Sequence, residues 1–131
     1  MGDLRRLSVR DGYRAGVTDC IFCKIAAGQI PATIVKRTER VLAFRDLNAQ
    51  APVHVLVIPV DHHENVAALA VADPGVLAEL VAVAEAIAAQ EAADSNGACR
   101  LVFNSGEEAG QSVFHVHGHV LAGRPFTWPP G

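Results

Sequence analysis

Residues 115–120 read His-Val-His-Gly-His-Val, and this stretch guides the interpretation of the whole chain. In an extended strand successive side chains point to opposite faces, so we expect the histidines on one face and Val116, Gly118 and Val120 on the other. Repeated imidazoles on a short apolar strand need polar partners. An exposed polar face on an edge strand is the alternative. Because neutral histidine binds metals, attacks electrophiles and shuttles protons, the stretch predicts a functional site.

The segment before these histidines, residues 105–112, is a loop that contains two glycines. Gly106 and Gly110 allow a ligand to approach the backbone closely, and free N–H groups near Ser112 could hold phosphate oxygens. An ordinary hairpin loop is the alternative. Because the loop leads directly into the histidine strand, we interpret the pair as a site for chemistry at phosphorus.

Local patterns around this strand predict an α+β domain. A short helix is expected over 20–27, capped by Thr18 or Asp19, and a long amphipathic helix over 74–93, capped by Asp73. Short β-rich runs are expected at 33–37, 41–46, 54–59, 99–104 and 114–121.

The segment between the third run and the long helix has a second helix signal. Asp61 and Glu64 have the spacing of a capping box, which predicts a helical turn towards Leu69. Taken together, the elements predict a five-stranded antiparallel sheet with one long and one short helix.

Composition excludes several classes of protein. The chain has 131 residues, of which 50% are hydrophobic and 19% charged, with a net charge of −3. This fits one folded domain, at 19–131, preceded by an extension at 1–18. The balance argues against disorder and, without a run of Lys or Arg, against nucleic-acid binding. No apolar stretch is long enough to span a membrane, and the extension lacks the apolar core of a secretory signal, so we expect a cytoplasmic protein.

Two of the cysteines, Cys20 and Cys23, are three positions apart. On a helical turn their thiols face the same way, which supplies half of a zinc site. His62 or His63, together with one histidine of the strand, could complete a Cys2His2 tetrahedron. A redox pair and plain buried thiols are the alternatives, and Cys99, inside an expected strand, is assigned to the core.

Residues 110–121, Gly-Gln-Ser-Val-Phe-His-Val-His-Gly-His-Val-Leu, resemble the signature of the histidine triad family, in which histidines alternate with apolar residues. Gly118 departs from it at one apolar position. Ser112 is typical of the Hint branch, whereas the dinucleotide-cleaving Fhit branch typically has Thr there. Further segments resemble the Hint branch at 21–22, 30–32, 42–46, 50–59 and 128–131.

This resemblance implies a purine nucleoside phosphoramidase, a hydrolase that cleaves the P–N bond between AMP or GMP and an amine. His117 would attack the α-phosphorus and become nucleotidylated, with His54 near the phosphate. Ser112 and a protonated His119 would stabilise the charge that grows on the phosphate oxygens. The resemblance assigns nucleotide binding to Ile21, Phe22, Phe44, Asp46, Leu47, Asn104, Gly110, Ser112, Val113, His117, His119 and Trp128. Within this set the four apolar residues at 21–47 would form the base slot, and Asp46 would bind the ribose hydroxyls.

The resemblance also implies a structural zinc ion, as in zinc-bearing members of the family, and no organic cofactor. A homodimer is implied in which two sheets join into one of ten strands and Trp128 reaches towards the partner's site. Two other functions fit the same residues. One is the hydrolysis of dinucleoside polyphosphates or nucleotidyl transfer, and the other is a non-enzymatic, zinc-stabilised nucleotide-binding adaptor. The zinc ligands implied are Cys20, Cys23, His62 and His115.

Overall fold

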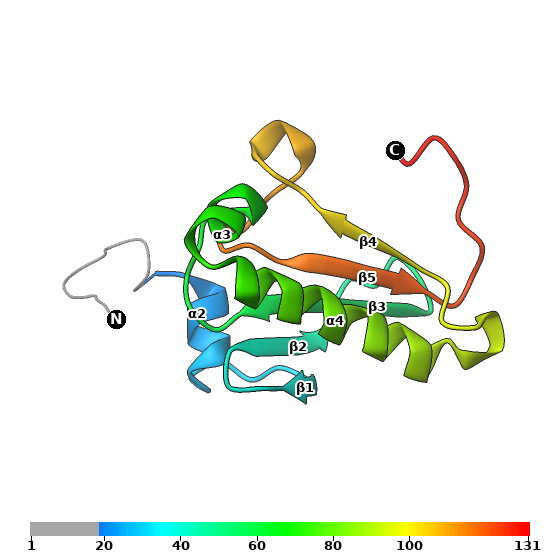
Figure 1. Cartoon of the computed structure of the whole chain (residues 1–131), viewed down its shortest axis with the longest axis horizontal. Helices are drawn as coiled ribbons and strands as arrows, with labels where there is room; N and C mark the ends of the chain where they lie inside the picture. The colour runs from blue at the N-terminus through cyan, green and yellow to red at the C-terminus, as the bar shows by residue number, and fades with distance from the viewer. Residues whose placement is uncertain (1–18) are drawn as a thin grey trace.

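The computed structural model describes residues 19–131, and the expected extension at 1–18 lies outside the described residues. The strands are β1 (Ile34–Arg37), β2 (Val41–Arg45), β3 (Val53–Pro59), β4 (Cys99–Phe103) and β5 (Gly118–Ala122). They form a five-stranded sheet in the order β1-β2-β3-β5-β4, with every neighbouring pair antiparallel (Figure 1). The α+β class and the antiparallel sheet are therefore confirmed.

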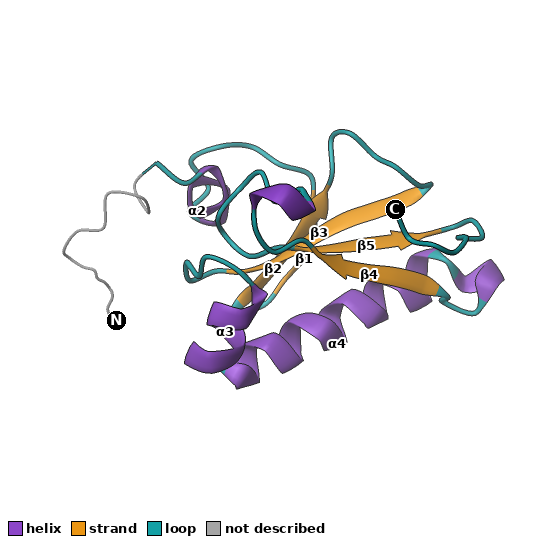
Figure 2. Ribbon diagram, turned by 90° about the horizontal axis from the view of Figure 1, so that it is seen from above, coloured by secondary structure: helices purple, strands orange, loops and turns teal. Residues whose placement is uncertain are grey.

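The described residues contain one long and two short α-helices, where one short helix was expected. They are α2 (Ile21–Ala26), α3 (Val66–Ala72) and α4 (Pro74–Glu91), with short 3₁₀ turns at η1 (Ala93–Ser95) and η2 (Glu107–Ala109). The start of α4 is as expected, because Asp73 accepts a hydrogen bond from the Val76 N–H at 3.2 Å and Pro74 takes the first helical position. Figure 2 shows α4 on one face of the sheet and α2 on the other.

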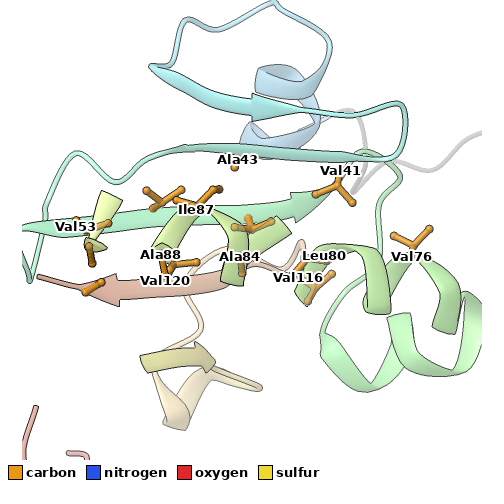
Figure 3. Packing of buried hydrophobic residues seen from close by; sticks show 14 of the residues in the cluster. Val41, Ala43, Val53, Val76, Leu80, Ala84, Ile87, Ala88, Val116 and Val120 are labelled. Atoms are coloured by element: carbon orange, nitrogen blue, oxygen red, sulfur yellow. The ribbon is translucent and has the colours of Figure 1, made fainter. Parts of the chain in front are cut away.

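Both faces of the central strands are buried. On one face, residues of α4 such as Leu80, Ala84 and Ile87 pack against Val41 and Val120 of the sheet (Figure 3). On the other face, α2 covers a second apolar cluster made of Cys20, Phe22, Ile25, Leu42, Phe44, Leu56 and Ile58. Every residue of β3 is buried as a result, including the polar side chain of His54.

Two helix starts differ from their expected positions. Cys20 itself caps α2 in place of the expected Asp19, since its Sγ accepts a hydrogen bond from the Cys23 N–H at 3.3 Å. The other expected cap, Thr18, lies outside the described residues. The capping box at 61–64 does not form. Helix α3 begins at Val66 instead, where Asn65 accepts a hydrogen bond from the N–H of the third helical residue at 2.9 Å.

The start of the last strand also differs from the expected 114–121. Regular pairing with β3 begins only at Gly118, which lies opposite Val57. The preceding residues bond to the 61–64 loop and to the end of β3 instead: Val116 N–H donates to the carbonyl of His63 at 2.7 Å, and the His115 ring contacts the carbonyl of Pro59. These bonds replace the ladder at the position where β3 ends in a proline, which has no N–H to donate.

Candidate functional site

The alternation of side chains expected for 115–120 is present, although β5 covers only its second half. Val116 and Val120 pack in the core beneath α4, whereas the rings of His115 and His117 both contact Phe22 of α2. A Cβ on Gly118 would lie 3.0 Å from Cζ of Phe103, so the ring from β4 occupies the space that a larger residue would need. The departure from the family signature at this position is therefore explained by packing.

A hydrogen bond to the backbone fixes the tautomer of His117. Its Nδ1 lies 2.9 Å from the carbonyl oxygen of His115, and because a carbonyl can only accept, Nδ1 carries the proton and donates. Nε2 is then the unprotonated nitrogen of the neutral ring. Burial lowers the pKa of His117 below its usual value, which favours the neutral form. The ring stands edge-on to Phe22, with 5.1 Å between centroids.

Hydrogen bonds also fix the tautomers of His54 and His119. The Gln50 N–H donates to Nδ1 of His54 at 3.0 Å, so the proton of neutral His54 is on Nε2. That nitrogen lies 3.0 Å from Nδ1 of His119. When His54 donates along this contact, Nε2 of His119 carries a proton that it can offer to a ligand.

The expectation of a protonated His119 is wrong for the free protein. Burial, followed by the charges of His117 and His54, lowers the pKa of His119 to about 4. Its ring is therefore neutral near pH 7, and it can contact a phosphate as a neutral N–H donor.

Asp46, expected at the ribose, also contacts this pair. One carboxylate oxygen lies 3.4 Å from Nε2 of His54, and the other accepts from the Asn48 N–H at 2.8 Å. Each carboxylate oxygen has a further lone pair, so the half-buried group can still accept from a hydroxyl. Sequence reasoning did not find the Asp46–His54–His119 chain, because its members come from three separate segments.

The expected base slot is only partly assembled. The rings of Phe22 and Phe44 are buried with their centroids 5.5 Å apart, next to His117. Leu47, by contrast, is 100% exposed, and Ile21 is 45% exposed on the rim of a different pocket. The neighbours of the two rings that sequence reasoning missed are Ile25, Ile30 and Leu56.

The residues expected at the phosphate divide between two pockets. Asn104 lines a pocket together with His54 and His119. Ser112 and Val113 line another pocket, of about 470 Å³, beside α2 and the cysteines.

The backbone between these pockets turns at Gly110. Its φ of 97° is strained for other residues, and a Cβ there would lie 3.7 Å from the Asn104 side chain. Trp128, on the C-terminal segment, is 81% exposed.

Sequence reasoning also missed Gln111, which organises this loop. Its side chain is buried, accepts from the Gly106 N–H at 2.9 Å, and donates to the carbonyls of Glu64 and Val113 at 2.7 and 3.0 Å. A polar side chain satisfied in this way joins the glycine loop to the 61–64 segment. The only signal in the sequence was its place between Gly110 and Ser112.

Cys20, Cys23, His62 and His115 come together as a cluster, with all four ligand atoms within 4.8 Å of one another. Sγ of Cys20 lies 3.3 Å from Nδ1 of His115, and Sγ of Cys23 lies 3.4 and 3.5 Å from Nδ1 of His62 and His115. Ligand atoms around a tetrahedral zinc ion are about 3.5 Å apart, so these separations fit zinc.

The chemistry of the cluster also suits a metal ion. Nε2 of His115 donates to the carbonyl of Pro59 at 2.8 Å, which leaves Nδ1 unprotonated and facing the thiols. The side-chain hydrogen bond from Cys23 lowers the pKa of Cys20 to about 2, which favours the thiolate form that binds metals. The side-chain hydrogen bond with Cys20, followed by burial, raises the pKa of Cys23.

Of the two neighbouring histidines considered as ligands, the structure brings only one to the cysteines. The His63 side chain lies in a separate small pocket with Arg40 and Asp73, and burial lowers its pKa.

Comparisons with known proteins agree with this fold. The family model described as "HIT domain" matches residues 27–126. The chain is 44% identical to a 14 kDa zinc-binding protein of Zea mays over 85% of this chain and 87% of that protein. It is also similar to the crystal structure of a HIT family hydrolase from Legionella pneumophila, with a TM-score of 0.79, 44% identity and coverage of 86% of this chain and 100% of that one.

A third similar protein is a zinc-bound histidine triad family protein from Mycobacterium smegmatis, with a TM-score of 0.71 and 32% identity over 82% of this chain and 77% of that one. With a family model that matches most of its length and these relatives, the chain belongs to the histidine triad (HIT) family. Within residues 19–131, no helix is long and apolar enough to cross a membrane.

Proposed function

We propose that the protein hydrolyses purine nucleoside 5′-phosphoramidates, in which AMP or GMP is joined to an amine, through a nucleotidyl-histidine intermediate. The observation that carries this proposal is the hydrogen bond from Nδ1 of His117 to the backbone, which leaves Nε2 free to attack. The similarity to a HIT family hydrolase supports a hydrolytic reaction.

The proposed reaction has two steps. In the first, Nε2 of His117 forms a bond to the α-phosphorus, the P–N bond to the amine breaks, and the leaving nitrogen takes up one proton from solvent. In the second, water attacks phosphorus, the bond to His117 breaks, and one proton returns to solvent. Nε2–H of His119 donates to a non-bridging oxygen in both steps, where negative charge grows.

The nucleoside is proposed to lie on the β2 side of His117. Phe22 and Phe44 offer buried aromatic rings beside His117 for the base, and Asp46 follows β2 with an oxygen available to the ribose hydroxyls. In this proposal Leu47 and Ile21 close on the base only when it binds, because both are exposed in the free protein. Asn104 contacts the phosphate from the other side, next to His119.

Ser112, Val113 and Trp128 keep their assigned roles only through a rearrangement on binding. Ser112 and Val113 lie in the pocket beside α2, and Trp128 is exposed. We propose that substrate draws the 110–113 backbone, which turns at Gly110, towards the phosphate, and that Trp128 completes the site of a partner chain.

We also propose that Cys20, Cys23, His62 and His115 hold a structural zinc ion, supported by their geometry and by the zinc-binding relatives. Four protein ligands leave no open position, so the ion would stabilise the fold and not polarise substrate. The reduced thiols and the nucleotide substrate suit a cytoplasmic location.

A substrate panel tests the proposed activity. Adenosine and guanosine 5′-phosphoramidates of a simple amine are compared with diadenosine polyphosphates, at equal concentration and by kcat/KM. We expect the phosphoramidates to be preferred by at least about tenfold, because the leaving amine takes up a proton easily. Comparable or faster cleavage of the polyphosphates would identify a dinucleotide hydrolase, and nucleotide binding with no turnover of any substrate would identify a binding protein.

A further inference from the structure

A pocket of about 330 Å³ lies at the β4–β5 end of the histidine face, and the proposed function uses only one edge of it. His54, His119 and Asn104 line the edge nearest the proposed reaction. Arg100, Arg124 and Phe126 are also among its lining residues. A liquid water molecule occupies about 30 Å³, so this pocket has room for a group as large as a small amino acid.

The two arginines reach this pocket from different segments. Arg100 is on β4 opposite Leu121 and two positions before Val102, which is opposite His119, so it shares the histidine face. Arg124 follows β5. Their guanidinium carbons lie 5.4 and 4.3 Å from the centre of the Phe126 ring.

Backbone carbonyls hold the two guanidinium groups in place. Arg100 donates to the carbonyl of Thr127 at 2.9 Å, and Arg124 donates to the carbonyl of Gln50 at 3.1 Å. Each guanidinium has five N–H donors, so donors remain for a ligand.

This pair of cations lacks the acidic partner that Arg40 and Arg45 have. Arg40 and Arg45 form ion pairs with Glu79 and Glu91, at 2.9 and 2.6 Å. Within residues 19–131, neither of the two pocket arginines forms an ion pair, and no Asp or Glu is among the residues that line the pocket. Two cations around one ring repel each other, and a bound anion would remove that cost.

The order of the strands indicates which part of a substrate would meet these cations. The proposed nucleoside side is at β2, the reacting histidines are on and just before β5, and the arginines lie on β4 and after β5. A nucleotide that crosses the sheet from β2 to β5 would thus direct its leaving group towards β4.

We propose that this pocket is a leaving-group subsite in which Arg100 and Arg124 bind a carboxylate carried by the amine, so that the preferred substrates are purine nucleotides joined to an amino acid through its nitrogen. This inference rests on the proposed function and names its substrate class. Guanidinium groups suit carboxylates because their paired N–H donors match the two oxygens.

The test uses matched substrates that differ only in charge. AMP is joined through nitrogen to glycine, β-alanine or γ-aminobutyrate, and each conjugate is compared with its neutral carboxamide. We expect kcat/KM to favour the carboxylate by about tenfold for at least one chain length, the effect of one charge-assisted hydrogen bond. The preference should shrink in 0.5 M KCl, because these guanidinium groups are partly exposed.

Variants of the two arginines test whether the preference for the carboxylate comes from this pocket. In the double variant Arg100→Gln/Arg124→Gln the ratio should fall to about one, whereas Arg100→Lys/Arg124→Lys should keep part of it. Arg37→Gln is the control, because the Arg37 guanidinium also donates to a backbone carbonyl, but lies on β1. Thermal unfolding checks that each variant is folded.

Binding to the His117→Asn protein separates this inference from the proposed activity. Titration with each carboxylate and carboxamide pair gives a ratio of Kd that does not depend on turnover. A ratio near one for every pair, or a ratio that the double glutamine variant leaves unchanged, would overturn the subsite even if the phosphoramidates are hydrolysed. If the Kd values favour the carboxylates but the unmodified protein hydrolyses none of the conjugates, the subsite is kept and the phosphoramidase is rejected.

Discussion

The imidazole of His117 is held by one hydrogen bond, and that bond decides which nitrogen can react. Since Nδ1 donates to the backbone, Nε2 keeps its lone pair without any movement of the ring. We predict that His117→Asn lowers kcat on an AMP phosphoramidate by at least about 10³-fold, because no other side chain replaces the nucleophile. The Kd for AMP should change by less than about threefold, because the proposed contacts with Phe22, Phe44 and Asp46 would remain. Single-turnover kinetics and calorimetry measure the two quantities.

The control for this variant is His63→Asn, which removes an imidazole from a pocket away from the reacting histidines. Its kcat should stay within about twofold of the unmodified protein. Near-normal turnover by His117→Asn would reject the covalent mechanism.

His119 predicts a pH dependence of stability. Its pKa is about 4 in the folded protein, against 6.5 for a solvent-exposed imidazole. Between these values the unfolded chain binds more protons than the folded protein, so the free energy of unfolding falls as pH falls from 6.5 to 4. Burial and the charges of His117 and His54 lower the pKa of His119, whereas the carboxylate of Asp46 opposes this shift.

Urea unfolding at pH 7.5 and pH 5.0 measures this effect, with His119→Gln as the comparison. The unmodified protein should lose about 1–2 kcal/mol more than the variant between these two pH values. Both proteins contain the same cysteines and the same His62 and His115, so the titration of the metal-binding cluster cancels. Equal losses in the two proteins would show that His119 titrates at its ordinary pH.

Among the elements of the fold, helix α2 depends most on the metal-binding cluster. The helix has only six residues, too few to be stable alone, and Cys20 caps it while Cys23 lies on its first turn. Zinc would join this helix to the 61–64 loop through His62 and to the segment before β5 through His115. We predict one zinc per chain in protein purified without chelator, measured by elemental analysis.

Loss of the metal should destabilise the fold. The double variant Cys20→Ser/Cys23→Ser should contain no zinc and should unfold on the order of 10 °C lower. Cys99→Ser is the matched control, because this thiol contacts Glu85 on the other face of the sheet and should leave zinc content and Tm unchanged. Substoichiometric zinc together with a Tm that chelation does not alter would mean that the cysteines are ordinary core thiols.

For the whole molecule, the two edges of the sheet differ in how readily they can accept another strand. Strand β1 has an irregular register between Ile34 and Lys36 and carries exposed charges at Lys36 and Arg37, features that discourage pairing. Strand β4 pairs regularly with β5 along all five of its residues, and its side chains are half-buried. We therefore predict a homodimer that pairs β4 with β4 of a second copy.

Sedimentation velocity tests this assembly. The unmodified chain should sediment as a dimer, and Val102→Lys, which places a charge on β4, should give a monomer. Ile34→Lys is the control at the other edge and should remain dimeric. A monomeric unmodified protein would reject the assembly, and dissociation by Ile34→Lys alone would move the contact to β1.

Much of the fold could be predicted from local sequence because its causes are local. Asp73 and Pro74 start α4 by satisfying N–H groups within the next helical turn, so three neighbouring residues were enough to place it. The alternation at 115–120 likewise followed from the geometry of an extended chain. His115, His117 and His119 lie on one face as expected. Cys20 and Cys23 lie at the start of one short helix, also as expected.

The chemistry of the site, by contrast, was decided by contacts between residues far apart in the chain. Which nitrogen of His54 carries the proton depends on a bond from the Gln50 backbone, and the low pKa of His119 depends on its burial and on the charges of His117 and His54. The start of β5 moved to Gly118 because β3 ends in a proline. The amino-acid sequence by itself determined which groups were available and on which face of their element they lie. Only tertiary structure decided their protonation, their partners and the cationic pocket next to them, because burial and electrostatic energies depend on distances that local patterns do not contain.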